Sequence, residues 1–171
     1  SMLVDKTKKG SDEEKAEADE LMSLLTPIAK AFLTETGFEA ANQGLQIFGG
    51  HGFISEWGME QNVRDCRISM LYEGTTGIQA LDLLGRKVLM TQGATLKRFT
   101  KIVHKFCKEH KGDKRFKAYI SVLDKLNSEW GDVTLKIGMK AMRNKDEVGA
   151  ASVDYLMFSG YVVLAYFWAR M

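Results

Sequence analysis

Residues 19–52 read DELMSLLTPIAKAFLTETGFEAANQGLQIFGGHG, and this stretch decides the fold class. Its apolar residues recur at three- and four-residue steps, the spacing of an amphipathic helix: Leu21, Leu24, Leu25, Ile28, Phe32, Phe38, Ala41, Leu45 and Phe48. Pro27 predicts a first turn or a kink near the start of that helix. Gly49, Gly50 and Gly52 predict its end, because glycine readily adopts the left-handed conformation common where helices stop.

Helical spacing recurs to the end of the chain. Further helices are predicted at about residues 59–72, 76–88, 94–110, 113–130, 132–145 and 148–171, with the later breaks at residues 111–113, Gly131 and Gly149. Thr75 and Thr76 are good N-cap residues, and Gln79 follows Thr76 at the spacing of a capping box. This pattern places Glu73 in a turn between two helices.

The composition agrees with an all-α fold. One proline among 171 residues removes the commonest helix breaker. We predict a helical bundle at residues 21–92 and a helical extension at residues 93–171, preceded by a flexible acidic lead-in at residues 1–20. Ser1-Met2 has the form of a tag remnant, which implies that the natural protein begins upstream.

Charge is distributed unevenly, although the formal net charge is only +2. Acidic residues crowd residues 12–20, and basic residues crowd residues 97–117. The basic run predicts a solvated helix face, with nucleic acid or an anionic CoA as the alternative partner. Two cysteines in a chain of this size give no disulfide framework and favour a reducing compartment.

Two further patterns predict structure without special chemistry. No metal site is expected, because helical spacing spreads the nearest ligand-type residues over a wide arc without a fourth ligand: His104, Cys107 and His110. Residues 155–169 are strongly apolar, but Asp154 and Arg170 bracket them too closely for a membrane span of about 20 residues. We expect a core or subunit-interface helix there.

Three ordered motifs carry a specific resemblance. They are Gln46-x-x-Gly49-Gly50, then Arg64-Asp65, then Tyr72-Glu73-Gly74-Thr75-x-x-Ile78-Gln79. Their spacing resembles the C-terminal helical domain of the acyl-CoA dehydrogenases over residues 21–88. The remainder is similar to the C-terminal extension of a subgroup that includes acetyl-CoA-dehydrogenase-like and 3-methylthiopropionyl-CoA dehydrogenase proteins.

The resemblance implies a reaction and a role for each motif. The family uses FAD to oxidise an acyl-CoA to the 2,3-enoyl-CoA, and Glu73 matches the base that removes the α-proton, with Gly74 beside the substrate. Contacts to FAD are implied for two segments: Gln46, Gly49 and Gly50, and then Thr75, Thr76 and Gly77. Arg64 and Asp65 are expected to form a structural ion pair. Since other domains of the family hold most of the flavin and CoA contacts, we expect this chain alone to be inactive.

The resemblance also implies partners, namely an acyl-CoA substrate, electron-transfer flavoprotein and further copies of the chain in a homo-oligomer. It favours the bacterial cytoplasm over the mitochondrial matrix and leaves the acyl-chain preference open. Two alternatives remain. One is an acyl-CoA oxidase, which passes electrons to oxygen, and the other is a non-enzymatic helical module for oligomerisation or nucleic-acid binding, in which the Glu73 turn is vestigial.

Overall fold

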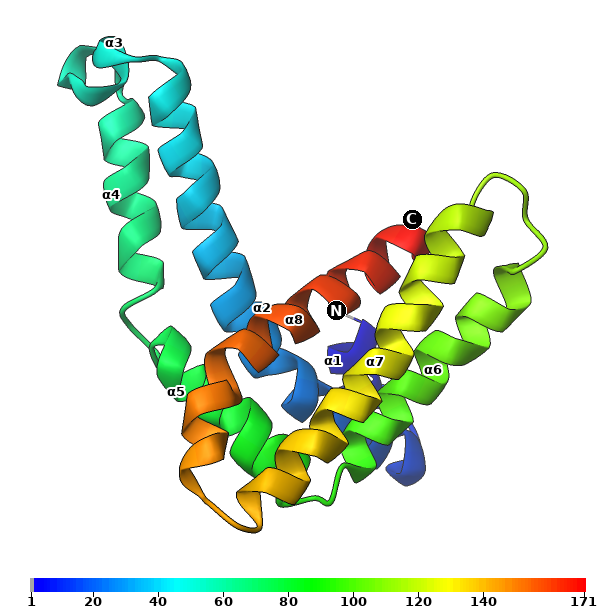
Figure 1. Ribbon diagram of the computed structural model, residues 1–171. Coiled ribbons are helices and arrows are strands. Elements are labelled where there is room, and N and C mark those ends of the chain that lie inside the picture. The colour runs from blue at the N-terminus through cyan, green and yellow to red at the C-terminus, as the bar shows by residue number, and fades with distance from the viewer. Residues whose placement is uncertain (1) are drawn as a thin grey trace.

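The computed structural model describes residues 2–171, and these form helices, turns and loops without a β-strand. The predicted all-α class is therefore confirmed (Figure 1). In chain order the elements are α1 (Met2–Lys9), α2 (Asp12–Ile47), α3 (Gly50–Phe53), the 3-10 helix η1 (Ser55–Trp57), α4 (Met59–Ser69), α5 (Thr76–Leu81), the π-helix η2 (Asp82–Leu89), α6 (Ala94–His110), α7 (Lys117–Ala141) and α8 (Asp146–Arg170).

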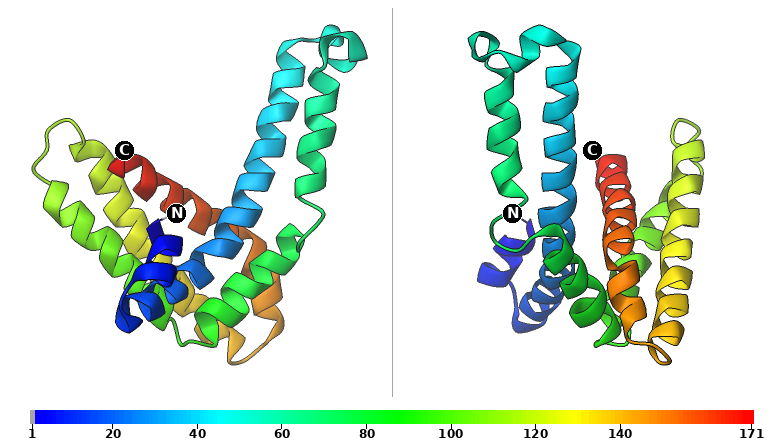
Figure 2. Two further views of the ribbon diagram at one scale, coloured as in Figure 1. Left: turned by 180° about the vertical axis from the view of Figure 1, so that it is seen from behind. Right: turned by 60° about the vertical axis from the view of Figure 1, so that its left-hand side comes forward.

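A two-helix arm projects from one side of the molecule. It consists of the C-terminal half of α2 and the whole of α4, which run side by side in opposite directions, with α3 at the tip (Figures 1 and 2). We use "the arm" for residues 33–69. Within it Gly52 is the one buried residue, so the arm has almost no core of its own.

The core lies at the base of the arm, where helices from both ends of the sequence meet. α8 packs against α7, α5 and α2, and α6 packs against α7. The largest fully buried side chains come from these helices and from η2: Leu24, Ile28, Leu83, Leu84, Val88, Val103, Leu123, Trp130, Leu156 and Val162. Residues 21–92 and 93–171 therefore share one hydrophobic core.

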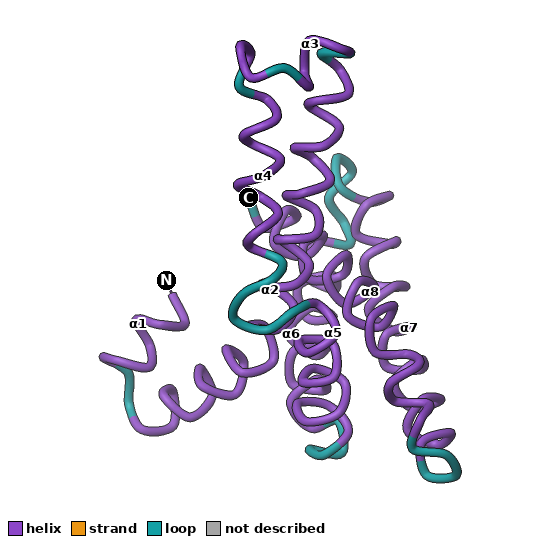
Figure 3. Tube along the Cα trace, turned by 90° about the vertical axis from the view of Figure 1, so that its left-hand side faces the viewer, coloured by secondary structure: helices purple, strands orange, loops and turns teal. Residues whose placement is uncertain are grey.

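Helix breakers interrupt these helices less often than the sequence predicts. Pro27 lies inside α2 and not in a first turn, and α2 changes direction between its first turns and the arm (Figure 3), as expected for a helix with an internal proline. The breaks predicted at Gly131 and Gly149 are wrong, because α7 and α8 run through them. Glycine costs a helix interior about 1 kcal/mol, which the burial of a side chain as large as Trp130 outweighs.

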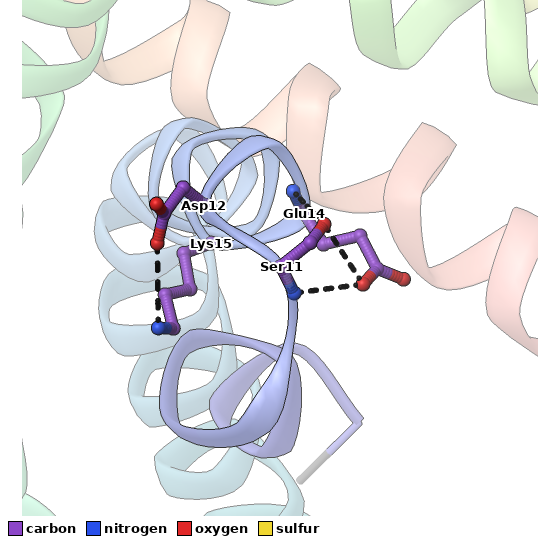
Figure 4. Close-up of polar contacts among 4 residues, drawn as sticks. All are labelled: Ser11, Asp12, Glu14 and Lys15. Atoms are coloured by element: carbon purple, nitrogen blue, oxygen red, sulfur yellow. Dashed lines mark hydrogen bonds and ion pairs between the residues drawn. The ribbon is translucent and has the colours of Figure 1, made fainter.

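Residues 2–9 and 12–20 are helical, whereas the charge of this segment predicts a flexible lead-in. α1 packs against α2, and α2 begins at a capping box. The Ser11 hydroxyl accepts the Glu14 N–H at 3.3 Å while the Glu14 carboxylate accepts the Ser11 N–H at 3.0 Å (Figure 4). Donation to the Glu14 carboxylate lowers its pKa, from the Ser11 N–H above all and also from the Ser11 hydroxyl at 3.2 Å. Ser1, the expected tag remnant, lies outside the described residues.

α8 carries the strongly apolar segment of residues 155–169. One face of α8 is buried in the core, through residues that include Tyr155, Leu156 and Val162, so the predicted core role is confirmed. In the described part of the chain, α8 is also the one helix long and apolar enough to cross a membrane by length and composition. Core helices share that property.

Candidate functional site

Glu73 lies in the loop that joins α4 to α5 at the base of the arm (teal in Figure 3). Its backbone φ is 56°, and that of Gly74 is 92°. Residues with a Cβ rarely adopt such angles, so Glu73 holds a strained conformation. A Cβ at position 74 would also lie 2.7 Å from the Gln79 side-chain nitrogen. The turn therefore requires glycine at position 74 and keeps Glu73 out of any helical hydrogen-bond ladder.

Side chains from two helices hold the carbonyl groups of this turn. Gln79 Nε2 of α5 donates to the Glu73 carbonyl oxygen at 3.0 Å. Lys30 Nζ of α2 donates to the Gly74 carbonyl oxygen at 2.6 Å. Both bonds are accepted by backbone carbonyl oxygens, so they fix the backbone of the turn and leave the Glu73 carboxylate free of them.

The start of α5 differs from the predicted capping box. The Thr76 hydroxyl donates to the Glu35 carboxylate on α2, and Gln79 bonds the Glu73 turn, so Thr76 and Gln79 do not cap the helix together. Thr75 is the N-cap residue and makes no side-chain capping bond. The first N–H groups of α5, which include that of Gly77, receive no side-chain cap.

The Glu73 carboxylate itself is exposed and has no hydrogen bond or ion pair within residues 2–171. Apolar side chains before it in the turn and in α5 are also exposed, with Leu71 50 %, Tyr72 53 % and Ile78 60 % accessible. The candidate base thus stands on an open apolar surface of this chain.

The glycine corner lies at the tip of the arm. Gln46 is in the last turn of α2, Gly49 follows with φ 58°, and Gly50 begins α3; all three are exposed. A Cβ at either glycine would meet no atom within 4 Å. α4, 11 residues long and so about 16 Å, separates this corner from the Glu73 turn. Within a single chain, the two candidate FAD segments therefore lie apart.

Arg64 and Asp65 do not form the expected ion pair with each other. Both are exposed on α4, and Asp65 accepts a hydrogen bond from Gln61 at 2.7 Å. Arg67 of α4 instead faces α2, where its guanidinium carbon lies 5.6 Å from the centre of the Phe38 ring. Helical spacing identifies position 67 as one candidate for the inner face of α4, but not its aromatic partner on α2.

The ligand-type residues of α6 have other partners. His104 Nδ1 lies 2.8 Å from Asp124 Oδ1, and His110 Nδ1 lies 2.9 Å from the Phe106 carbonyl oxygen. Cys107 is 2 % exposed, and burial raises the pKa of its thiol to about 11. Residues 2–171 contain no group of three side chains placed to hold a metal ion.

A groove of about 1020 Å³ lies between η2, α6 and α7. Its lining is mainly apolar and includes Leu89, Leu96, Leu135 and Met139. It contains none of the residues singled out by the sequence motifs, so the groove and the Glu73 turn are separate features.

Two family descriptions match adjacent parts of the chain. Residues 3–89 match "Acyl-CoA dehydrogenase, C-terminal domain", and residues 99–171 match "Acetyl-CoA dehydrogenase C-terminal like". The first match covers Glu73 and both segments at which FAD contacts are expected. It also includes α1, which lies in the segment predicted from the sequence to be a flexible lead-in.

Two bacterial proteins illustrate the similarity. A 3-methylmercaptopropionyl-CoA dehydrogenase of Ruegeria pomeroyi is 49 % identical over 100 residues, which are 58 % of this chain and 17 % of that protein. The broad-specificity linear acyl-CoA dehydrogenase FadE5 of Mycobacterium tuberculosis is 31 % identical over 153 residues, which are 86 % of this chain and 25 % of that protein. The chain thus spans a quarter or less of the length of these relatives.

A solved structure shares the fold. The apo form of Bd2924 superposes with a TM-score of 0.62 at 20 % identity, over 96 % of this chain and 29 % of that one. The resemblance carried by the three motifs is confirmed by the family match over residues 3–89. The chain belongs to the acyl-CoA dehydrogenase family and contains its C-terminal helical domain.

Proposed function

We propose that the full-length protein is an FAD-dependent acyl-CoA dehydrogenase in which Glu73 removes the α-proton of an acyl-CoA thioester. The observation that carries this proposal is the placement of Glu73. Its carboxylate has no partner within residues 2–171, although both carbonyl groups of its turn are held by side chains from α2 and α5. A fixed backbone with an unpaired carboxylate is what a base needs when it must face a ligand.

A carboxylate becomes a competent base for a carbon acid only in dry surroundings. Burial beside apolar groups disfavours the charged form and makes the group more basic. Leu71, Tyr72 and Ile78, in the same turn and at the start of α5, offer apolar surface and are each at least half exposed. We infer that other parts of the full-length protein and the acyl chain cover this surface and exclude water from the carboxylate.

The backbone of the turn offers a second contribution. The Glu73 N–H has no acceptor within residues 2–171. Placed against a thioester carbonyl, such an N–H stabilises the negative charge that grows on the carbonyl oxygen as the α-proton leaves, as donors do in an oxyanion hole. Base and donor then belong to one residue, and Gly74 allows the substrate to approach the backbone.

The two segments assigned to FAD fit a contact made through the backbone. Thr75, Thr76 and Gly77 begin α5 without a side-chain cap, which leaves N–H groups for a phosphate or ring oxygen. Gly49 has open space where a Cβ would stand, so an extended group has room at the corner that follows Gln46. When bound, FAD supplies the acceptor for the hydride that leaves Cβ. Because α4 separates the segments, each is proposed to contact a different part of the cofactor or a cofactor in a neighbouring subunit.

The same proposal extends to partners and compartment. We assign electron-transfer flavoprotein as the electron acceptor, a homo-oligomer as the assembly and the bacterial cytoplasm as the location, supported by the bacterial relatives. This chain by itself is proposed to be inactive, since it spans a quarter or less of those relatives. A flavin absorbance band in purified 171-residue protein would count against that.

A substrate screen with the full-length protein tests the proposed reaction. Reduction of a dye acceptor is measured with straight-chain acyl-CoA thioesters and with 3-methylmercaptopropionyl-CoA, which the name of the Ruegeria pomeroyi relative suggests. Glu73→Gln keeps the size of the side chain and removes the base, so kcat should fall by about 100- to 10,000-fold. Wild-type kcat in that variant would refute the role of Glu73. Stoichiometric peroxide release would instead identify an acyl-CoA oxidase.

A further inference from the structure

The turn that carries Glu73 is held by residues distant from it in sequence. Lys30 on α2 and Gln79 on α5 each donate to a carbonyl oxygen of the turn, at 2.6 and 3.0 Å. Lys30 is half-buried and forms no ion pair within residues 2–171. Its ammonium group therefore binds the Gly74 carbonyl in place of a carboxylate, and a charge-assisted bond of this length is strong.

The two bonds hold a conformation that the chain would not otherwise keep. Glu73 at φ 56° and Gly74 at φ 92° form consecutive left-handed residues, and the first of them carries a Cβ. Such a residue persists only where the surrounding structure over-determines it. Without a donor to either carbonyl oxygen, the peptide groups of the turn could rotate about their flanking φ and ψ bonds. This rotation would move the Glu73 carboxylate relative to α2.

The same bonds also orient the N–H groups of the turn. In a trans peptide the C=O and N–H point in opposite directions. The Gly74 N–H therefore points away from Gln79, and the Thr75 N–H points away from Lys30. Neither N–H has an acceptor within residues 2–171. A donor at the carbonyl oxygen polarises the peptide and strengthens its N–H as a donor.

We propose that Lys30 and Gln79 are positioning residues that lock the left-handed turn and so place the Glu73 carboxylate for proton removal. This inference rests on the proposed function. Neither side chain touches the reacting atoms; both act through the two backbone carbonyl oxygens that they hold. A displacement of about 1 Å at a reacting group lowers a rate by about 100-fold, so the loss of either bond affects the chemical step.

Steady-state kinetics of the full-length enzyme test the proposal with Lys30→Met and Gln79→Met, which remove the donors and keep most of the side-chain volume. Lys136→Met is the control, because Lys136 is exposed on α7 and forms no ion pair within residues 2–171. We expect kcat to fall by about 10- to 100-fold in the two turn variants, with KM changed by less than about threefold, and no change in the control.

Two further measurements separate positioning from a loss of folded protein. The isotope effect on kcat with α-deuterated acyl-CoA should rise in Lys30→Met and Gln79→Met, because a displaced base makes proton removal more rate-limiting. Lys30→Arg keeps a cationic donor and should recover at least part of the loss. If Lys30→Met fails to fold, Gln79→Met and Lys30→Arg carry the test.

Glu73→Gln distinguishes the failure of this inference from the failure of the proposed function. An inactive Glu73→Gln enzyme combined with kcat within about twofold of wild type in folded Gln79→Met and Lys30→Met would overturn the positioning role alone. An unchanged isotope effect with a reduced kcat would also overturn it. An active Glu73→Gln enzyme would remove the proposed function and the positioning role together.

Discussion

Replacing Gly160 with alanine probes how closely α8 packs against α2. A Cβ at position 160 would lie 2.2, 2.3 and 2.8 Å from Cδ2, Cγ and Cβ of Phe32. Phe32 is 2 % exposed, and its ring makes an edge-on contact with Tyr161 at 5.0 Å between centroids, so it has little room to move. Gly149 on the same helix gives a matched control, because a Cβ there would meet no atom within 4 Å.

The two substitutions should change the free energy of unfolding in opposite directions. At both positions alanine favours the helix by about 1 kcal/mol relative to glycine. At Gly149 that gain is the whole effect, so Gly149→Ala should stabilise the protein by about 1 kcal/mol. At Gly160 the added methyl group overpacks the core, which costs about 1–3 kcal/mol, and a buried ring at 2.2 Å places the cost near 3. The net loss is then about 2 kcal/mol.

Urea unfolding of the 171-residue protein, followed by far-ultraviolet circular dichroism, measures both changes. In a chain of this size the Gly160→Ala loss corresponds to a Tm lower by about 4–8 °C. A Gly160→Ala protein as stable as wild type would refute the close contact between α2 and α8. An equal loss in Gly149→Ala would show that packing against Phe32 is not the cause.

Two further predictions concern buried titratable groups. Burial raises the pKa of Tyr155 from 10.0 to about 12, so its contribution to stability is complete below pH 10 and is lost as the pH rises toward 12. Tyr155→Phe removes the 2.7 Å hydrogen bond to Thr134 and should lower the free energy of unfolding by about 1 kcal/mol at neutral pH. In urea titrations between pH 10 and 12, the stability of this variant should fall less steeply than that of wild type. Parallel declines would contradict this. Cys107 is 2 % exposed with a thiol pKa of about 11, whereas Cys66 is partly exposed. A disulfide reagent at mildly alkaline pH should therefore label one thiol in native protein and none rapidly in Cys66→Ser, and fast labelling of that variant would show that Cys107 is accessible.

Helices with a regular apolar stripe are predictable from this sequence, because the stripe records which face is buried. α6 begins and ends at the predicted residues. Gly131 is misread, because the cost of a glycine is a local property while the burial of Trp130 that offsets it depends on the packing of other helices. The start of α2 is missed for a different reason, since the signal at Ser11 and Glu14 is present but lies in a segment without apolar periodicity.

In the candidate site, too, local motifs predict some residues, and others depend on packing between distant segments. The motif Tyr72-Glu73-Gly74-Thr75 singles out Glu73 and Gly74 as candidates, because its spacing resembles that of the family. The residue that holds their turn from the other side is Lys30, and 44 residues separate it from Gly74. No local pattern joins such a pair. The Arg64–Asp65 pairing fails likewise, because adjacent helical residues point in different directions.

The arm has a thermodynamic consequence for the isolated chain. With Gly52 as its one buried residue, opening of residues 33–69 exposes little apolar surface beyond what is already in water. Its amides should exchange with deuterium well before those of α7 and α8 around Trp130, and a protease should cut there first. In the full-length protein, slower exchange along the same residues would map the surface against which the arm docks.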